Sequence, residues 1–168
     1  KGRIWIAVES LYSMDGDRAP LTELAELAER HDAFLVIDEG HATGVFGPDG
    51  RGLAADLEGR DNIVTLHTLG KALGCEGALV CAAKPLTDYL VNRGRGFIFS
   101  TAPSPLMAAV TRAAFALADD SHRRRLAALM ESAGGIFTDR LGTPATGTQI
   151  IPVILGDNGR TMRIAAFL

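Results

Sequence analysis

The hydrophobic pattern of the first forty residues predicts a strand, a helix and a second strand. Residues 4–8 (IWIAV) are apolar and rich in β-branched side chains, which is typical of a strand. From Leu21 to Ala28, apolar residues recur at helical spacing behind Pro20, which suits the first turn of a helix. Residues 33–38 (AFLVID) form a continuous apolar run, as in a strand buried in a parallel sheet. Together these elements predict a right-handed βαβ unit.

The rest of the chain continues this alternation and then becomes helical. Apolar runs predict further strands over 62–68 (NIVTLHT), 77–83 (GALVCAA) and 97–100 (FIFS), after a glycine-rich loop. From Pro103 the alanine-rich composition predicts two helices, with Ser121 placed to cap the second. Another strand is expected over 149–155 (QIIPVIL), and the last residues look like the opening turns of a helix.

These elements predict an α/β fold with a mostly parallel sheet flanked by helices in three layers. Residues 1–145 are expected to form part of a large domain, and residues 146–168 the start of a smaller one. The chain begins already running into a strand, so we interpret it as a fragment of a longer protein.

Composition narrows the choice of partners. The 168 residues are 47% apolar and 22% charged, as in a globular protein with one sizeable core. A net charge of −3 does not indicate binding to nucleic acid or to an anionic membrane surface. There is no signal-peptide pattern, so a cytoplasmic location is the default expectation. We interpret Cys75 and Cys81 as reduced packing residues, and the spacing of the histidines predicts no metal site.

Polar side chains follow three of the predicted strands. In open parallel sheets, ligands bind beyond the carboxyl ends of the strands. The residues expected at this rim are Ser13, Asp38, Glu39, Gly40, His41, His67, Thr68 and Lys71. Lys71 does not belong to a phosphate-binding loop of the Gly-Lys-Ser/Thr type, because Ala72 stands where the hydroxyl is required.

Two interpretations of the rim remain open on the residues alone. Asp38 and Lys71 could form a structural ion pair, since an unpaired buried carboxylate is costly. Alternatively, the rim could bind pyridoxal phosphate (PLP), which needs a lysine for its Schiff base and an aspartate beside its ring nitrogen. Thr68 would then serve the phosphate.

Three segments carry a resemblance to a known family. Residues 10–21 (SLYSMDGDRAPL), 36–52 (VIDEGHATGVFGPDGRG) and 68–74 (TLGKALG), in this order and spacing, resemble the α-oxoamine synthases. These are fold type I PLP enzymes that join an amino acid to an acyl thioester. The resemblance covers essentially the whole chain and implies a PLP-binding large domain. Gly40 departs from the alanine usual at its position.

The resemblance implies three catalytic residues. Lys71 would bind PLP as its Schiff base, and Asp38 would pair with the protonated ring nitrogen. His41 would lie near the phenolic oxygen of the cofactor.

The resemblance implies further cofactor-binding residues. Ser13 would also lie near the phenolic oxygen, and Thr68 would bind the phosphate. Ser100 and Thr101 would lie near the phosphate of the neighbouring subunit's cofactor, which implies a homodimer with shared active sites.

Substrates are also implied by resemblance. Residues 97–105 (FIFSTAPSP) and 150–162 (IIPVILGDNGRTM) look most like the members that use L-alanine and a pimeloyl thioester, on CoA or a carrier protein. Residues 68–74 match the glycine-using members of the family equally well.

Two rivals come from other classes of protein. The run FLVIDEGH is also typical of a nucleotide-driven motor, but there the glycine-lysine loop precedes the acids and carries a hydroxyl. A binding module that kept the fold and lost the chemistry is the second rival, and the intact Lys71, Asp38 and His41 argue against it.

Overall fold

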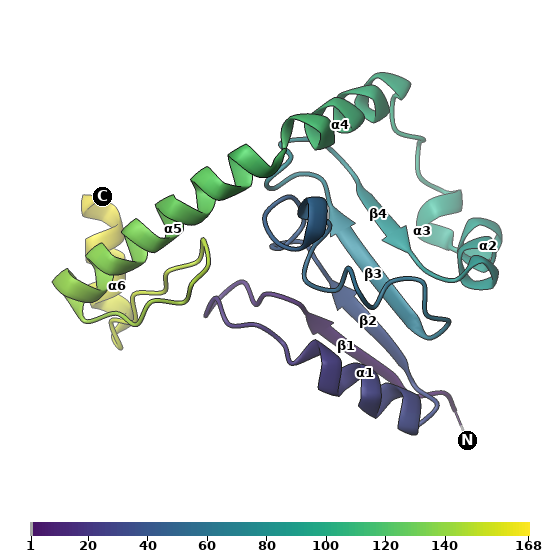
Figure 1. The fold of residues 1–168 in the computed structure, drawn as a ribbon, viewed down its shortest axis with the longest axis horizontal. Coiled ribbons are helices and arrows are strands. Elements are labelled where there is room, and N and C mark those ends of the chain that lie inside the picture. Colours follow the sequence, from purple (N-terminus) through teal and green to yellow (C-terminus); the bar gives the residue numbers. More distant parts are fainter. Residues whose placement is uncertain (1) are drawn as a thin grey trace.

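A four-stranded sheet forms the centre of the computed structural model, which describes residues 2–168 (Figure 1). Its strands are β1 (Trp5–Glu9), β2 (Phe34–Asp38), β3 (Ile63–Thr68) and β4 (Ala78–Cys81), side by side in this order. β1, β2 and β3 are parallel, and β4 runs antiparallel to β3. The register sets Asp38 beside both Glu9 and Leu66, so the carboxyl ends of the parallel strands meet at one edge.

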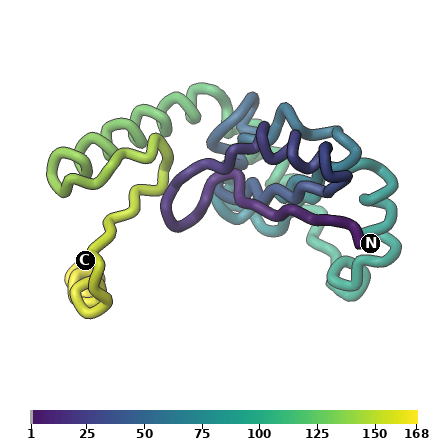
Figure 2. Tube along the Cα trace, turned by 90° about the horizontal axis from the view of Figure 1, so that it is seen from below, coloured from purple at the N-terminus to yellow at the C-terminus, as the bar shows by residue number. Residues whose placement is uncertain are grey.

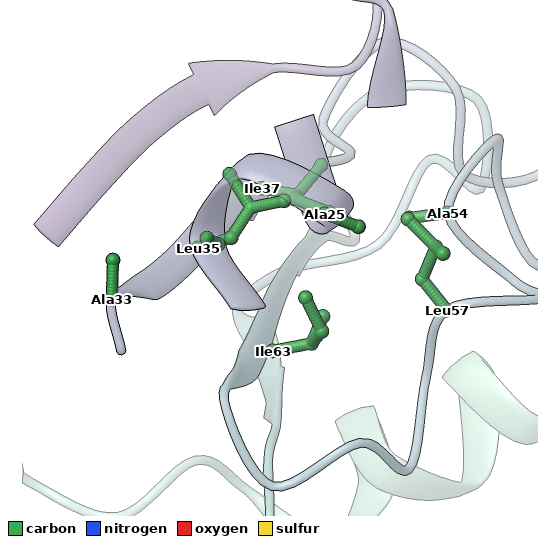
Figure 3. Close-up of a cluster of buried hydrophobic side chains, with 8 residues drawn as sticks. Ala25, Ala33, Leu35, Ile37, Ala54, Leu57 and Ile63 are labelled. Carbon is green, nitrogen blue, oxygen red and sulfur yellow. The ribbon is translucent and has the colours of Figure 1, made fainter. Parts of the chain in front are cut away.

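The core lies between the sheet and helix α1 (Leu21–Arg30), which returns the chain from β1 to β2. Small residues on α1 let the helix approach the strand closely, because Ala25 and Ala28 are both buried against it. Figure 3 shows most of the cluster that they form with the sheet and the following loop: Ala25, Ala28, Ala33, Leu35, Ile37, Ala54, Leu57 and Ile63. The predicted βαβ unit is therefore confirmed.

The second half of the chain is helical. Its helices are α2 (Lys84–Arg93), α3 (Arg95–Ile98), α4 (Pro105–Leu117), α5 (Asp120–Leu141) and α6 (Asn158–Phe167), and a single 3-10 turn, η1, spans Pro48–Gly50. Figure 2 shows α5 and α6 leading away from the sheet. The helix expected at the end of the chain is confirmed. Across residues 2–168, no helix combines the length and apolarity needed to cross a membrane.

Three local predictions were wrong. Residues 97–100 form no strand, because α3 covers Phe97 and Ile98. Residues 149–155 are extended but pair with no strand in the described part of the chain. The second long helix is capped by Asp119, whose carboxylate accepts from the His122 N–H at 3.0 Å, and Ser121 lies inside the helix.

Candidate active site

The turn that carries Lys71 is held rigidly between β3 and β4. The Leu69 N–H donates to the Gly77 carbonyl at 3.0 Å, and the Cys75 N–H donates to the Leu69 carbonyl at 2.8 Å. Leu69, Leu73 and Cys75 are buried in a second apolar cluster. This cluster is completed by residues of α4 and its C-cap: Met107, Ala114, Phe115 and Ala118. Packing therefore fixes the backbone of the turn, while the Lys71 side chain stays exposed.

Asp38, Thr68 and Lys71 converge on Gly40. The Gly40 N–H donates to Asp38 Oδ1 at 2.7 Å, and Thr68 Oγ1 donates to the Gly40 carbonyl at 3.4 Å. A methyl group added to Gly40 would lie 2.9 Å from Asp38 Oδ1, 3.0 Å from Lys71 Nζ and 3.2 Å from Thr68 Oγ1. A carboxylate, an amine and a hydroxyl thus approach Gly40 so closely that a side chain at this position would force at least one of them to move.

The structural ion pair between Asp38 and Lys71 is not formed. Among the ion pairs of residues 2–168, no nitrogen–oxygen distance within 4.0 Å joins these two side chains. Both groups instead border Gly40. The carboxylate and the amine are therefore not neutralised by pairing with each other.

The C-terminal segment reaches the same edge of the sheet. Gln149 Nε2 donates to the His41 carbonyl at 2.6 Å. The buried Thr148 Oγ1 donates to the Gly16 carbonyl at 3.4 Å, in the turn that follows β1. Sequence reasoning did not find Gln149 or Thr148, since contacts 108 and 132 residues apart leave no local pattern. The loop carrying His41 is therefore anchored from a remote part of the chain.

Three other predicted site residues, Ser13, Ser100 and Thr101, lie in exposed segments. Ser13 is exposed in the turn after β1, where its N–H donates to Glu9 Oε2 at 3.1 Å. Ser100 and Thr101 are exposed in the segment between α3 and α4, and β4 lies between this segment and β2 (Figure 1). Among residues 2–168, no hydrogen bond or ion pair joins Ser13, Ser100 or Thr101 to Asp38 or Lys71.

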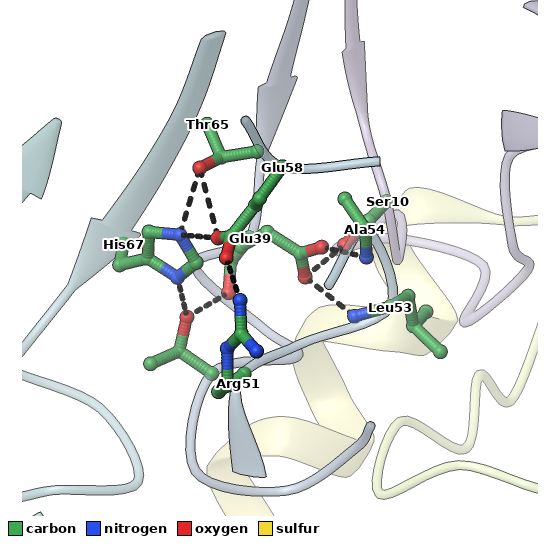
Figure 4. A network of polar contacts seen from close by, with 9 residues as sticks. Ser10, Glu39, Arg51, Leu53, Ala54, Glu58, Thr65 and His67 are labelled. Carbon is green, nitrogen blue, oxygen red and sulfur yellow. Dashed lines mark hydrogen bonds and ion pairs between the residues drawn. The ribbon is translucent and has the colours of Figure 1, made fainter. Parts of the chain in front are cut away.

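Glu39 is a buried structural acid. Its side chain is fully buried and accepts from Ser10 Oγ at 2.8 Å, from the Leu53 N–H at 3.0 Å and from the Ala54 N–H (Figure 4). Gly52, at φ +103°, admits the carboxylate, because a Cβ there would lie 2.5 Å from Glu39 Oε2. Glu39 thus fixes the loop after β2 and so the position of its neighbour Asp38.

Replacement of Glu39 by Ala is expected to lower the free energy of unfolding by about 3 kcal/mol or more, because three donors lose their acceptor and each costs about 1–3 kcal/mol. Ser10→Ala, which removes one donor from the same carboxylate, should cost about 1 kcal/mol. Urea unfolding of the full-length protein, followed by circular dichroism, measures both. Equal losses in the two variants would contradict the assigned role.

His67 does not lie at the rim as predicted. Successive side chains of a strand point to opposite faces, so His67 and Thr65 lie on the face opposite to Thr68. His67 is 6% exposed, and its Nε2 lies 3.0 Å from Glu58 Oε1 and 2.9 Å from Thr65 Oγ1. Its other nitrogen, Nδ1, lies 2.9 Å from Thr43 Oγ1. His67 therefore belongs to a separate polar network (Figure 4).

Arg51, Glu58 and Cys81, in and beside this network, have shifted pKa values, and the pKa of Arg51 is raised by its hydrogen bond to Glu58. Partial burial raises the pKa of the Glu58 carboxyl, but hydrogen bonds from Arg51 and Thr65 and the charges of His67 and Arg51 together outweigh burial and lower it. Arg51 Nη2 lies 2.5 Å from Glu58 Oε2. Burial and the negative charge of Glu58 raise the pKa of the Cys81 thiol. Cys81 is exposed and was wrongly interpreted as a packing residue.

Comparison with known proteins agrees with this geometry. The family model "Aminotransferase class I and II" matches residues 1–159. The 8-amino-7-oxononanoate synthase of Chromobacterium violaceum is 45% identical over 97% of this chain and 43% of that protein. Its counterpart in Anaeromyxobacter dehalogenans is 43% identical over 97% of this chain and 42% of its own. The chain therefore spans less than half the length of these relatives.

A solved structure shares the fold. A variant of serine palmitoyltransferase from S. paucimobilis, with a bound PLP-myriocin aldimine, superposes with a TM-score of 0.83 at 29% identity. The match covers 94% of this chain and 42% of that one. The mostly parallel sheet with flanking helices is thus the fold of the large domain of a PLP-dependent transferase.

Proposed function

The chain belongs to the aminotransferase class I and II family, and from this membership we propose that it forms part of a PLP-dependent 8-amino-7-oxononanoate synthase. The reaction joins L-alanine to a pimeloyl thioester, on CoA or a carrier protein. It releases carbon dioxide and the free thiol and gives a precursor of biotin. The observation that carries the proposal is the convergence of Asp38, Thr68 and Lys71 around Gly40.

The groups around Gly40 fit PLP by their chemistry. Lys71 Nζ is an exposed amine on a rigid turn, suited to bind the cofactor aldehyde covalently. Asp38 supplies a carboxylate whose Oδ1 is already oriented by the Gly40 N–H. Thr68 supplies a hydroxyl for the phosphate. When bound, PLP supplies an electron-accepting ring that stabilises negative charge at the amino acid Cα.

The roles of the protein groups follow from their positions. Asp38 would keep a proton on the ring nitrogen, because a carboxylate beside that nitrogen favours its charged form. Lys71 Nζ, once released by the incoming amino acid, would accept the proton from Cα. His41 and Ser13, in the loops after β2 and β1, would hydrogen-bond the phenolic oxygen.

Domain and assembly assignments complete the proposal. Residues 1–145 would be part of the PLP-binding large domain, and residues 146–168 would begin the smaller domain. The proposed boundary falls in the segment between α5, which ends at Leu141, and α6, which begins at Asn158. Ser100 and Thr101, exposed and beyond β4, would serve the cofactor of the neighbouring subunit in a cytoplasmic homodimer.

A second candidate is an α-oxoamine synthase that uses another amino acid. Serine is the substrate class favoured by the structural similarity to serine palmitoyltransferase. Glycine would be used by a 2-amino-3-ketobutyrate CoA ligase or a 5-aminolevulinate synthase. Relatives 45% and 43% identical over 97% of this chain carry the name 8-amino-7-oxononanoate synthase, which favours L-alanine.

The visible absorption of the full-length protein distinguishes these candidates. Titration with L-alanine is expected to shift the cofactor band saturably at lower concentrations than glycine or L-serine. Addition of pimeloyl-CoA or pimeloyl-carrier protein should then release carbon dioxide. Saturation at lowest concentration by glycine or L-serine would move the assignment to another member of the family. A protein that gains no such band with added PLP would contradict the proposal.

A further inference from the structure

A second cluster of ligand-type side chains lies apart from the Asp38 and Lys71 site. It consists of Glu58 from the loop after β2, His67 on β3 and Cys81 on β4. One ligand atom from each residue lies within 4.8 Å of the other two. The cluster shares no residue with the proposed PLP site, so the inference does not depend on the proposed function.

One arrangement of the hydrogen-bond network directs the lone pair of His67 at Glu58. Thr43 Oγ1 lies 2.9 Å from the Glu39 carbonyl and 2.9 Å from His67 Nδ1. When its single proton goes to the carbonyl, its oxygen accepts from the His67 Nδ1–H. In the neutral ring, Nε2 then carries the lone pair.

This lone pair faces another acceptor. His67 Nε2 lies 3.0 Å from Glu58 Oε1, which is a carboxylate oxygen and also only accepts. Thr65 Oγ1 lies 2.9 Å from Nε2 and 3.2 Å from Oε1, but its single proton can serve only one of them. With this tautomer the position between Nε2 and Oε1 holds a cation, either a proton or a metal ion, whereas in the other tautomer the Nε2–H donates directly to Oε1.

The third ligand favours a metal ion. A proton would join two of the three groups and leave Cys81 Sγ without a role, whereas a metal ion can bind all three. A set of imidazole, carboxylate and thiolate is typical of zinc, which often takes three protein ligands and a water molecule. Cys81 is exposed, so the ion has a path of entry.

The surroundings already orient two of the ligands. Thr43 holds His67 Nδ1, which is the partner that metal-binding histidines need on their other nitrogen. Arg51 pairs with Glu58 Oε2 and leaves Oε1 directed at the cluster. We propose that Glu58, His67 and Cys81 bind one Zn²⁺ ion, with the thiol proton released to water.

Zinc binding by metal-stripped, full-length protein tests the proposal. Equilibrium dialysis against ZnCl₂, with elemental analysis, should give one zinc per chain at this site, and competition with a chromophoric chelator gives its affinity. Cys81→Ser and Glu58→Gln should weaken binding at least about tenfold. Cys75→Ser, which changes the buried cysteine outside the cluster, is the matched control and should bind as the parent does.

Two further measurements make the outcome decisive. X-ray absorption of the zinc-loaded protein should show one sulfur ligand, and this ligand should be absent in Cys81→Ser. Lys71→Ala should keep its zinc, since Lys71 lies outside the cluster. No bound zinc, or equal affinity in the parent and in Cys81→Ser, would overturn the proposal and assign the cation to a proton on His67.

Discussion

Replacement of Lys71 by Ala in the full-length protein is expected to lower kcat/KM by at least about a thousandfold. The variant loses both the amine that binds the cofactor and the base for Cα, and a general base alone contributes about 10²–10⁴-fold. Borohydride reduction followed by peptide mass spectrometry should find PLP on Lys71 in the parent and on no residue in the variant. This measurement is independent of turnover.

The chain offers a matched control for Lys71. Lys84 is an exposed lysine on α2, paired with Asp88 at 2.8 Å, and it takes no part in the site. Lys84→Ala should retain the covalent cofactor and the activity of the parent. Turnover by Lys71→Ala equal to that of Lys84→Ala would exclude Lys71 as the reactive amine.

Replacement of Asp38 by Asn is expected to lower kcat about 10²–10³-fold, the range seen when one preorganised charge-stabilising group is removed. The amide keeps the shape and an acceptor for the Gly40 N–H but cannot hold a proton on the ring nitrogen. Lys71 is unchanged, so covalent binding of PLP should persist. Exchange of the Cα hydrogen of L-alanine with deuterium, followed by NMR, should slow in parallel with kcat.

The control for Asp38 is an exposed acid in the loop that follows β2. Asp56→Asn removes a carboxylate from the loop between β2 and β3 and should leave exchange unchanged. Exchange at the parental rate in Asp38→Asn would show that the carboxylate does not act on the cofactor ring. Loss of covalent PLP in this variant would instead assign Asp38 to binding alone.

The sequence predicted the elements whose packing is repetitive. One face of β2 is buried and the other is partly buried, so residues 33–37 are apolar. The amphipathic helix 21–30 must bury its small apolar side. Since parallel strands end at the same edge, the convergence of Asp38, Thr68 and Lys71 could also be predicted from where each strand ends.

Short apolar runs were harder to interpret. Four residues of FIFS fit a strand or one helical turn equally well, and periodicity cannot separate the two. In the structure, Phe97 and Ile98 belong to the helical turn α3. Residues 149–155 have strand-like composition, but a strand needs a neighbour to pair with, and the described chain supplies none.

The orientation of His67 and the cluster with Glu58 and Cys81 could not be predicted from spacing. Each ligand comes from a different element, so no local motif marks them. Strand alternation alone could have separated His67 from Thr68, since neighbouring residues on β3 face opposite sides of the sheet. The zinc proposal therefore rests on tertiary structure.

The hydrogen bond from Gln149 to the His41 carbonyl also bears on when the site is assembled during synthesis. The three parallel strands have been synthesised by residue 68 and β4 by residue 81, whereas Gln149 follows 108 residues after His41. Domains fold as the chain is made, from the N-terminus onward. Asp38 and Lys71 are therefore made well before the residue that anchors the neighbouring loop, and the loop carrying His41 receives this hydrogen bond only after Gln149 has been made.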